Sequence, residues 1–180
     1  MMSILLDELD ENMTIVNNLY DRIKLEKKGC RYLYQHHTNF DSIPKDSVEF
    51  YGKLPLQSKI YYFTYDGLEA LKASGLLNKV PDRTVVLSII KAYAALNHIE
   101  KYYSSYLKQK ASYHSQLFNI PELSDLEKHS SSNWKIYIQY REALKILREL
   151  PQYQSSSMYL NKKEQLVKSI EHIKTCYRSN

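Results

Sequence analysis

An arginine and two histidines lie close together in the stretch RYLYQHH, residues 31–37. Arg31 and His36 are separated by four residues, and His37 follows directly. On one helix face, a guanidinium that binds phosphate and an imidazole that transfers a proton could together cleave RNA. Gly29 lies just before the stretch and is expected to end the preceding helix. We therefore interpret these residues as a helix end rather than an active site.

A second candidate site combines lysine and tyrosine side chains further along the chain. Exposed tyrosine rings could stack on nucleic-acid bases while lysines contact the phosphates. The tyrosine spacing also fits a contact between helices, and we prefer that interpretation. The residues are Lys101, Tyr102, Tyr103, Tyr106, Lys108, Lys110 and Tyr113.

Motifs for other kinds of chemistry do not occur in the sequence. The six histidines form no HExxH pattern, and the four glycines are isolated and form no phosphate loop. No serine or cysteine lies in a nucleophile elbow. We therefore predict no catalytic residue, no metal site and no cofactor, and expect that the protein is not an enzyme.

Length and composition favour one helical domain over residues 1–180. The chain has only 4 Gly and 5 Pro, too few for the turns of a many-stranded sandwich or barrel. Its 17 Tyr, against 4 Phe and 1 Trp, suit helical layers whose hydroxyls stay hydrated. The net charge of +5 comes from basic residues interspersed with acids, which is typical of a solvated surface.

The sequence also predicts a cytoplasmic location. The first twelve residues lack the pattern of a signal peptide, and no stretch approaches the roughly 18 apolar residues that span a bilayer. Cys30 and Cys176 lie far apart. A disulfide between them is an alternative, but two reduced thiols in a cytosolic protein are preferred.

The clearest helix is expected over residues 3–28. Its apolar positions alternate in steps of four and three, the pattern of a coiled coil: Leu5, Leu9, Val16, Leu19 and Ile23. Asn12 is the one polar residue in that series. A buried asparagine there would set helix register or partner number, and the alternative is that Asn12 lies at a hydrated edge.

Residues 29–62 show no helical period and predict a long irregular connection, with at most one helical turn. A short helix follows at about 65–74, ended by Gly75. The longest helix is expected at about 83–118, where a seven-residue repeat is interrupted only by Lys110. At 1.5 Å per residue it reaches roughly 50 Å, so we expect an elongated molecule with a projecting arm at about 100–130.

The last part of the chain predicts two further helical regions. One begins at Pro121 and is stopped by Pro151, and it is either one bent helix or two. The final helix begins near Ser157 and ends close to residue 180. The predicted fold is an all-α, elongated antiparallel helical bundle of four to six helices.

Three stretches resemble a recurrent pattern in uncharacterised prokaryotic helical proteins: LLDELDEN, FTYDGLEALKASGLL and YAALNHIE. That pattern consists of L-x-E-L-x-x-N, then F-[ST]-T-x-A-W-x-x-L-x-x-S-G-x-L, then a long helix with Y-x-x-L. The matching residues are Leu6, Glu8, Leu9, Asn12, Phe63, Thr64, Leu71, Ser74, Gly75, Leu77, Tyr93 and Leu96. The resemblance implies a helical module without an assigned activity, in which Phe63 and Leu68 fasten the short helix to the first one.

These observations lead to three functional hypotheses. The first is a non-enzymatic helical interaction or scaffold module that binds a protein partner or forms a homodimer. The second is a nucleic-acid-binding protein that uses the Lys/Tyr residues. The third is a metal-independent ribonuclease centred on Arg31 and His36.

Overall fold

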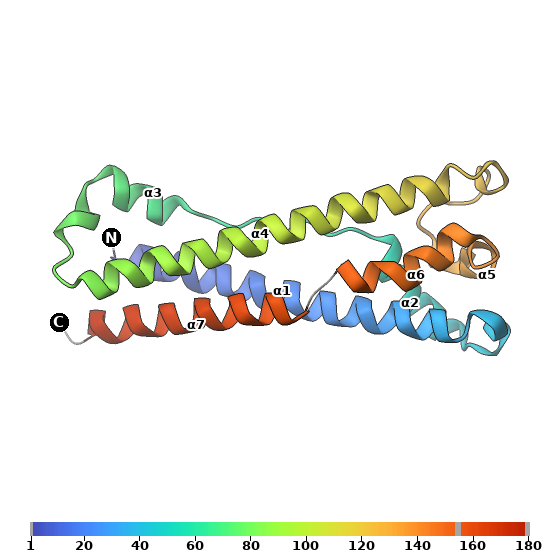
Figure 1. Ribbon diagram of the computed structural model, residues 1–180, viewed down its shortest axis with the longest axis horizontal. Coiled ribbons are helices and arrows are strands. Elements are labelled where there is room, and N and C mark those ends of the chain that lie inside the picture. Colours follow the sequence, from blue (N-terminus) through green and yellow to red (C-terminus); the bar gives the residue numbers. More distant parts are fainter. Residues whose placement is uncertain (1, 154–155, 179–180) are drawn as a thin grey trace. The chain divides into compact units, whose positions relative to one another are not determined.

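The computed structural model describes residues 2–153 and 156–178, and over these ranges the fold is all-α. The helices are α1 (Met2–Gln35), α2 (Lys45–Leu56), α3 (Asp66–Ala73), α4 (Arg83–Phe118), α5 (Trp134–Tyr137), α6 (Arg141–Tyr153) and α7 (Ser156–Arg178) (Figure 1). Short 3₁₀ helices lie at His37–Ser42, Leu76–Lys79, Pro121–Leu123 and Ser131–Asn133. The all-α prediction is confirmed, with seven α-helices in the described ranges where four to six were expected.

The residues group into two compact units. Unit 1 consists of Met1–Tyr20, Tyr61–Tyr102 and Ser156–Asn180, and unit 2 of Asp21–Ile60 and Tyr103–Ser155. The long helices α1 and α4 contribute residues to both units. Each unit has its own buried apolar core.

Unit 1 is built on three long helical segments. Lys174 of α7 donates hydrogen bonds to Asp10 of α1. Ser88 of α4 forms a hydrogen bond with His172 of α7. Nearer the other end of α7, Tyr102 of α4 contacts Tyr159 edge-on. These contacts show that α7 runs antiparallel to α4 (Figure 1).

Asn12 has a role that neither alternative from the sequence described. Its side chain is fully buried, donates to the carbonyl of Thr64 at 2.7 Å and accepts from the Thr64 amide at 3.0 Å. The asparagine therefore satisfies the backbone of the extended segment that leads into α3. Gly67, in the first turn of α3, donates its amide to buried Glu8, and a side chain there would lie 3.2 Å from the Leu5 Cα.

The predicted end of the first helix was wrong. α1 continues through Gly29 to Gln35, because Gly29 serves packing rather than termination. A Cβ atom at Gly29 would lie only 3.0 Å from the Tyr51 carbonyl oxygen, so the glycine lets α2 approach α1 closely. The glycine that does adopt a left-handed conformation is Gly75, with φ of 66°, at the predicted turn after α3.

The segment predicted to be irregular, 29–62, contains the end of α1, a 3₁₀ helix and the twelve-residue α2. Its apolar residues are not regularly spaced, and those that are buried pack within unit 2. Gly52 of α2 is covered by the indole of Trp134, whose Nε1 donates to the Gly52 carbonyl at 2.8 Å. Trp134 itself is fully buried.

α4 has the predicted bounds, and its seven-residue repeat is buried along its whole length. The buried series includes Ile89, Leu96 and Ile99 in unit 1 and continues through Tyr103, Tyr106, Lys110, Tyr113 and Leu117 in unit 2. From Tyr103 onward, the residues expected to form the arm at 100–130 belong to unit 2, where the α4 series is buried. Its tyrosine rings bury their apolar area while their hydroxyls find internal acceptors.

The region after Pro121 resolves into separate short elements. α5 and α6 are distinct helices, which answers the alternative of one bent helix or two. Pro151 lies inside the last turn of α6, and the helix continues past it to Tyr153. α6 runs antiparallel to α4, because Tyr113 donates to Glu149 at 3.0 Å and Lys145 contacts Gln116.

In the described ranges, no helix combines the length and the apolar character that a membrane span needs.

Candidate functional site

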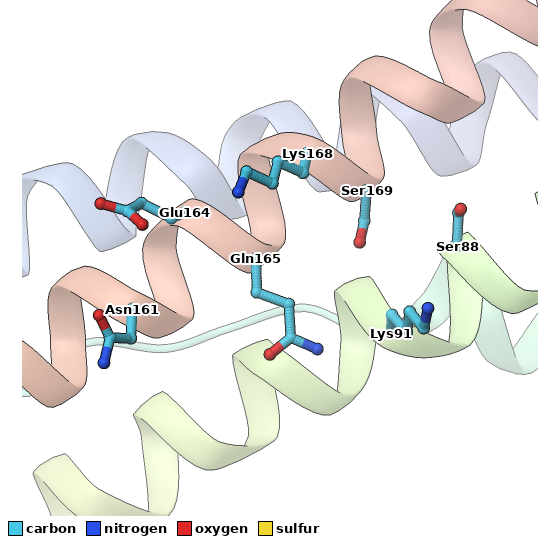
Figure 2. A pocket seen from close by; sticks show the side chains of 7 residues that line it. All are labelled: Ser88, Lys91, Asn161, Glu164, Gln165, Lys168 and Ser169. Carbon is cyan, nitrogen blue, oxygen red and sulfur yellow. The ribbon is translucent and has the colours of Figure 1, made fainter.

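A polar groove lies between α4 and α7 in unit 1. It has a volume of about 500 Å³, and its wall from α7 uses residues spaced three and four apart, which share one helix face. Figure 2 shows Gln165 and Ser169 directed toward α4. The groove carries both signs of charge, from Lys91, Lys168 and Glu164. The lining residues are Ser88, Lys91, Asn161, Glu164, Gln165, Lys168 and Ser169.

Apolar side chains flank this groove on the outer face of α4. Leu87 and Ile90 are 50% and 49% exposed, whereas Val85, Ile89 and Leu96 of the same helix are buried. With a helical period of 3.6 residues, both lie on the same face as the exposed Ala94. The arrangement offers a short apolar stripe beside groups that form hydrogen bonds and ion pairs.

The seven residues of the predicted Lys/Tyr site do not form one surface. Lys101, Tyr102 and Lys108 are exposed, whereas Tyr103, Tyr106, Lys110 and Tyr113 are buried. Tyr103 donates to the Lys59 carbonyl at 2.7 Å. The buried rings pack inside unit 2, as the preferred helix-contact interpretation expected, and are not accessible to nucleic-acid bases.

Arg31 and His36 are not brought together by the fold. Arg31 is an exposed residue of α1, and His36 follows the last residue of that helix. Residues five apart on a helix are separated by about 140° around its axis. The His36 ring instead hydrogen-bonds the Tyr32 carbonyl at 2.8 Å and packs against the Tyr32 ring.

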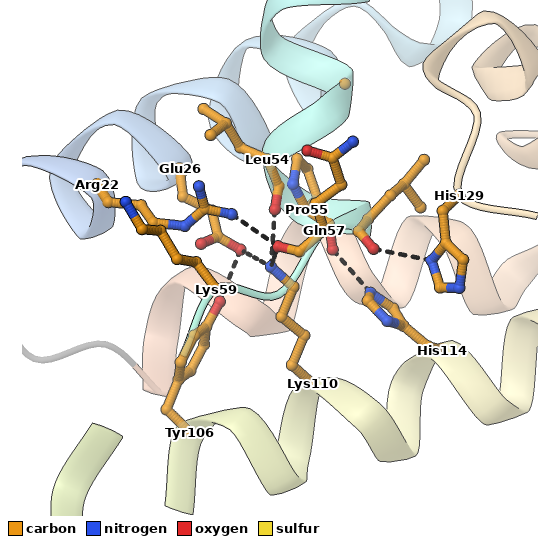
Figure 3. Close-up of polar contacts among 12 residues, drawn as sticks. Arg22, Glu26, Leu54, Pro55, Gln57, Lys59, Tyr106, Lys110, His114 and His129 are labelled. Carbon is orange, nitrogen blue, oxygen red and sulfur yellow. Dashed lines mark hydrogen bonds and ion pairs between the residues drawn. The ribbon is translucent and has the colours of Figure 1, made fainter. Parts of the chain in front are cut away.

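A buried ion pair in unit 2 links α1 to α4 (Figure 3). The Lys110 Nζ lies 2.7 Å from the Glu26 Oε1, and both side chains are at most 3% exposed. Lys110 also donates to the carbonyls of Leu54 and Gln57, each at 2.7 Å, and Tyr106 donates to Glu26 at 2.6 Å. All three ammonium protons therefore have acceptors, as a buried lysine requires.

Burial perturbs the groups around this pair. Desolvation lowers the pKa of Lys110, although Glu26 opposes that change. Desolvation and the nearby Glu26 charge raise the pKa of Tyr106 and of the fully buried Cys30 thiol well above their usual values. Because the cluster is closed to solvent, we assign it a structural role: it fixes the end of α2 and the following extended segment against the long helices.

The sequence contained a signal for this cluster. Glu26 occupies the next position in the series that runs through Leu19 and Ile23, and Lys110 follows Tyr106 in the series of α4. Two opposite charges at buried positions of two paired helices indicate an ion pair. The expected helix at 3–28 includes Glu26, but its series is defined by apolar residues that end at Ile23, so the apolar pattern alone does not match Glu26 with Lys110.

His114 supplies a pH-dependent contribution to stability. Its buried ring donates from Nε2 to the Pro55 carbonyl at 2.8 Å, and desolvation lowers its pKa from 6.5 to about 4. The unfolded chain therefore binds more protons between these values, and the stability present above pH 6.5 is lost as the pH falls toward 4. At 1.36 kcal/mol per unit, the expected loss is about 3 kcal/mol.

Urea denaturation of the wild type and of His114→Gln at several pH values would measure this loss. The variant should lack the part of the slope between pH 6.5 and 4 that His114 contributes. Parallel curves for the two proteins over that interval would contradict the assignment.

Comparisons of this chain with protein-family models, with curated proteins and with solved structures find no match. The resemblance to uncharacterised prokaryotic helical proteins stays a prediction from the sequence pattern.

Proposed function

We propose that the protein is a non-enzymatic helical interaction module that forms a homodimer through the α4–α7 face of unit 1. This face consists of the polar groove together with Leu87 and Ile90. The observation that carries the proposal is the exposure of these two aliphatic side chains, at 50% and 49%, directly beside the groove. An apolar centre with a polar rim is the usual anatomy of a protein interface.

A second copy of the chain is the partner that the charges favour. Unit 1 contains ten acidic and ten basic residues, so the unit that would form the interface carries no net charge. In a two-fold dimer the same face of both copies forms the interface. Glu164 of one copy can then pair with Lys91 or Lys168 of the other. The same face carries donors and acceptors, which makes it self-complementary.

The proposed location and the proposed state of the two cysteines are those predicted from the sequence. We place the module in the cytoplasm of a prokaryote, with Cys30 and Cys176 as free thiols. The coiled-coil pattern contributes to the buried cores, so the proposed interface uses the outer face of α4 instead of its seven-residue repeat.

The mass in solution tests the proposed dimer. We expect sedimentation or light scattering at micromolar concentration to give twice the 21.3 kDa of one chain. Replacing Leu87 and Ile90 by glutamate would put charges into the apolar centre and should raise the dissociation constant by at least about a hundredfold.

A matched control uses two exposed isoleucines of unit 2. Ile60 and Ile136 are 60% and 39% exposed, and the pair Ile60→Glu with Ile136→Glu adds the same charge away from the interface. This control should remain a dimer. A wild-type protein that stays at 21.3 kDa up to 100 µM (about the weakest affinity expected of such a face) would reject the proposal.

A further inference from the structure

A stripe of basic residues runs along the exposed side of α1 in unit 2. Lys24, Lys28 and Arg31 are exposed and follow one another by four and three positions, and Lys27 lies beside them. With 100° per residue, all four fall within an arc of about 100° on the helix. The stripe faces away from the buried Ile23, Cys30 and Leu33 side of α1.

Within the described residues, the cations of this stripe take part in no ion pair. The five ion pairs found in the described residues involve other basic residues, and Asp21 is the one acid of α1 that approaches the same face. Burial, and repulsion by Arg31, lower the pKa of Lys27. Unit 2 contains fifteen basic and ten acidic residues, so the whole net charge of +5 resides in this unit.

A row of aromatic rings lies along the edge of the basic stripe. The ring of Tyr32 is 4.5 Å from that of His36 and 4.9 Å from that of Tyr51, and Tyr51 is 5.1 Å from Phe50. The Lys28 Nζ lies 5.8 Å from the centre of the Tyr51 ring. Phe50, at the end of the row, is 56% exposed.

Gly29 is the reason that charges and rings meet here. The absence of a side chain at Gly29 lets the Tyr51 backbone approach α1 so closely that a Cβ atom there would lie 3.0 Å from the Tyr51 carbonyl oxygen. This contact places Tyr51 between Lys28 and Tyr32, one turn apart on α1. The close packing of Tyr51 against Gly29 thus also creates a composite surface, which we call the α1–α2 face.

We propose that the α1–α2 face, with the cations Lys24, Lys27, Lys28 and Arg31 beside the rings of Tyr32, Tyr51 and Phe50, binds single-stranded nucleic acid. The cations pair with successive phosphates of the backbone, and an unpaired base stacks on an exposed ring. A duplex keeps its bases stacked on each other and cannot use Phe50 in that way. This site differs in place and in residues from the Lys/Tyr series of α4, whose rings are buried.

The site is independent of the proposed dimer, because the α1–α2 face lies wholly in unit 2 and the dimer face wholly in unit 1. Loss of one activity therefore leaves the other to be measured.

Fluorescence anisotropy with a labelled twelve-nucleotide oligouridylate tests the proposal. We expect salt-dependent binding, with a slope of log K against log salt of about −3 for four phosphate contacts. The triple variant Lys24→Gln, Lys28→Gln, Arg31→Gln should bind at least about tenfold more weakly, with a slope near −1. Phe50→Ala should weaken binding about five- to tenfold at unchanged slope, because it removes stacking but no charge.

A charge-matched control separates this face from the net charge of the protein. Lys101→Gln, Lys108→Gln, Lys128→Gln removes three exposed lysines elsewhere and should leave affinity within about twofold, since local contacts dominate such binding. Equal losses in both triple variants would overturn the proposal. So would equal affinity for an RNA duplex or for polyphosphate of the same charge, since neither presents free bases.

Two further outcomes are decisive. Circular dichroism of each variant must match the wild type, and a Phe50→Ala protein that is folded yet binds the oligonucleotide normally would overturn the stacking role. Cleavage of the oligonucleotide that disappears in His36→Ala would replace binding by the ribonuclease hypothesis, whereas an intact oligonucleotide supports the binding site.

Discussion

Replacing Lys110 by methionine is expected to lower the free energy of unfolding by about 3–5 kcal/mol. Methionine keeps most of the apolar length of lysine, so the cavity term is small. The loss comes from Glu26, a buried carboxylate that would lose its ion pair and keep the hydrogen bond from the Tyr106 hydroxyl. The carbonyls of Leu54 and Gln57 would also lose a donor (Figure 3).

Urea denaturation followed by circular dichroism measures this effect, and a double-mutant cycle isolates the ion pair. Glu26→Leu alone should also be severely destabilised, because it strands the ammonium group of Lys110. The double variant Glu26→Leu with Lys110→Met should recover at least about 2 kcal/mol of the summed losses, since no unpaired charge remains. Additive losses in the double variant would show that the two groups do not interact in the folded protein.

Replacing Gly52 by alanine is expected to cost about 3 kcal/mol or more, the second largest effect. The added Cβ atom would lie 2.4 Å from Cδ1 and 2.5 Å from Nε1 of the Trp134 ring. That ring is fully buried and cannot move aside without opening the unit 2 core. Displacing it would also break the hydrogen bond from Trp134 to the Gly52 carbonyl, a further loss of about 1 kcal/mol.

Intrinsic fluorescence reports this substitution directly, because Trp134 is the one tryptophan of the chain. We expect a lower denaturation midpoint and a red-shifted emission from a more exposed indole. Gly29→Ala is the graded comparison: its Cβ atom would meet the Tyr51 carbonyl at 3.0 Å, so the cost should be smaller. If Gly52→Ala unfolds at the wild-type urea concentration, the close contact between α2 and Trp134 is not as described.

The two substitutions probe the same property of unit 2. α2 is only twelve residues long and would be a weak helix alone, since short isolated helices are marginal in water. It is held by glycine contacts with its neighbours and by buried polar groups, including Lys110 and His114, that donate to the carbonyls at its end. These interactions depend on partners more than fifty residues away in the chain.

The sequence determined those elements that carry a long regular period. The seven-residue repeat of α4 predicted its bounds, 83–118, because each added heptad repeats the same signal over a helix of 36 residues. The apolar series of α1 from Leu5 to Ile23 likewise predicted a buried face. Gly75 predicted the end of α3, and the structure shows it in a left-handed conformation just before the 3₁₀ helix Leu76–Lys79.

Tertiary structure alone decided the end of α1, the existence of α2 and the composition of the candidate surfaces. Gly29 reads locally as a helix terminator, and only the approach of Tyr51 shows that its missing side chain serves packing. In the sequence, Lys110 interrupts an apolar repeat. The structure shows that its ammonium group pairs with the Glu26 carboxylate. The physical reason is common to both: a local pattern records the conformation a residue prefers, whereas the role of a glycine or a buried charge depends on the group placed against it by distant parts of the chain.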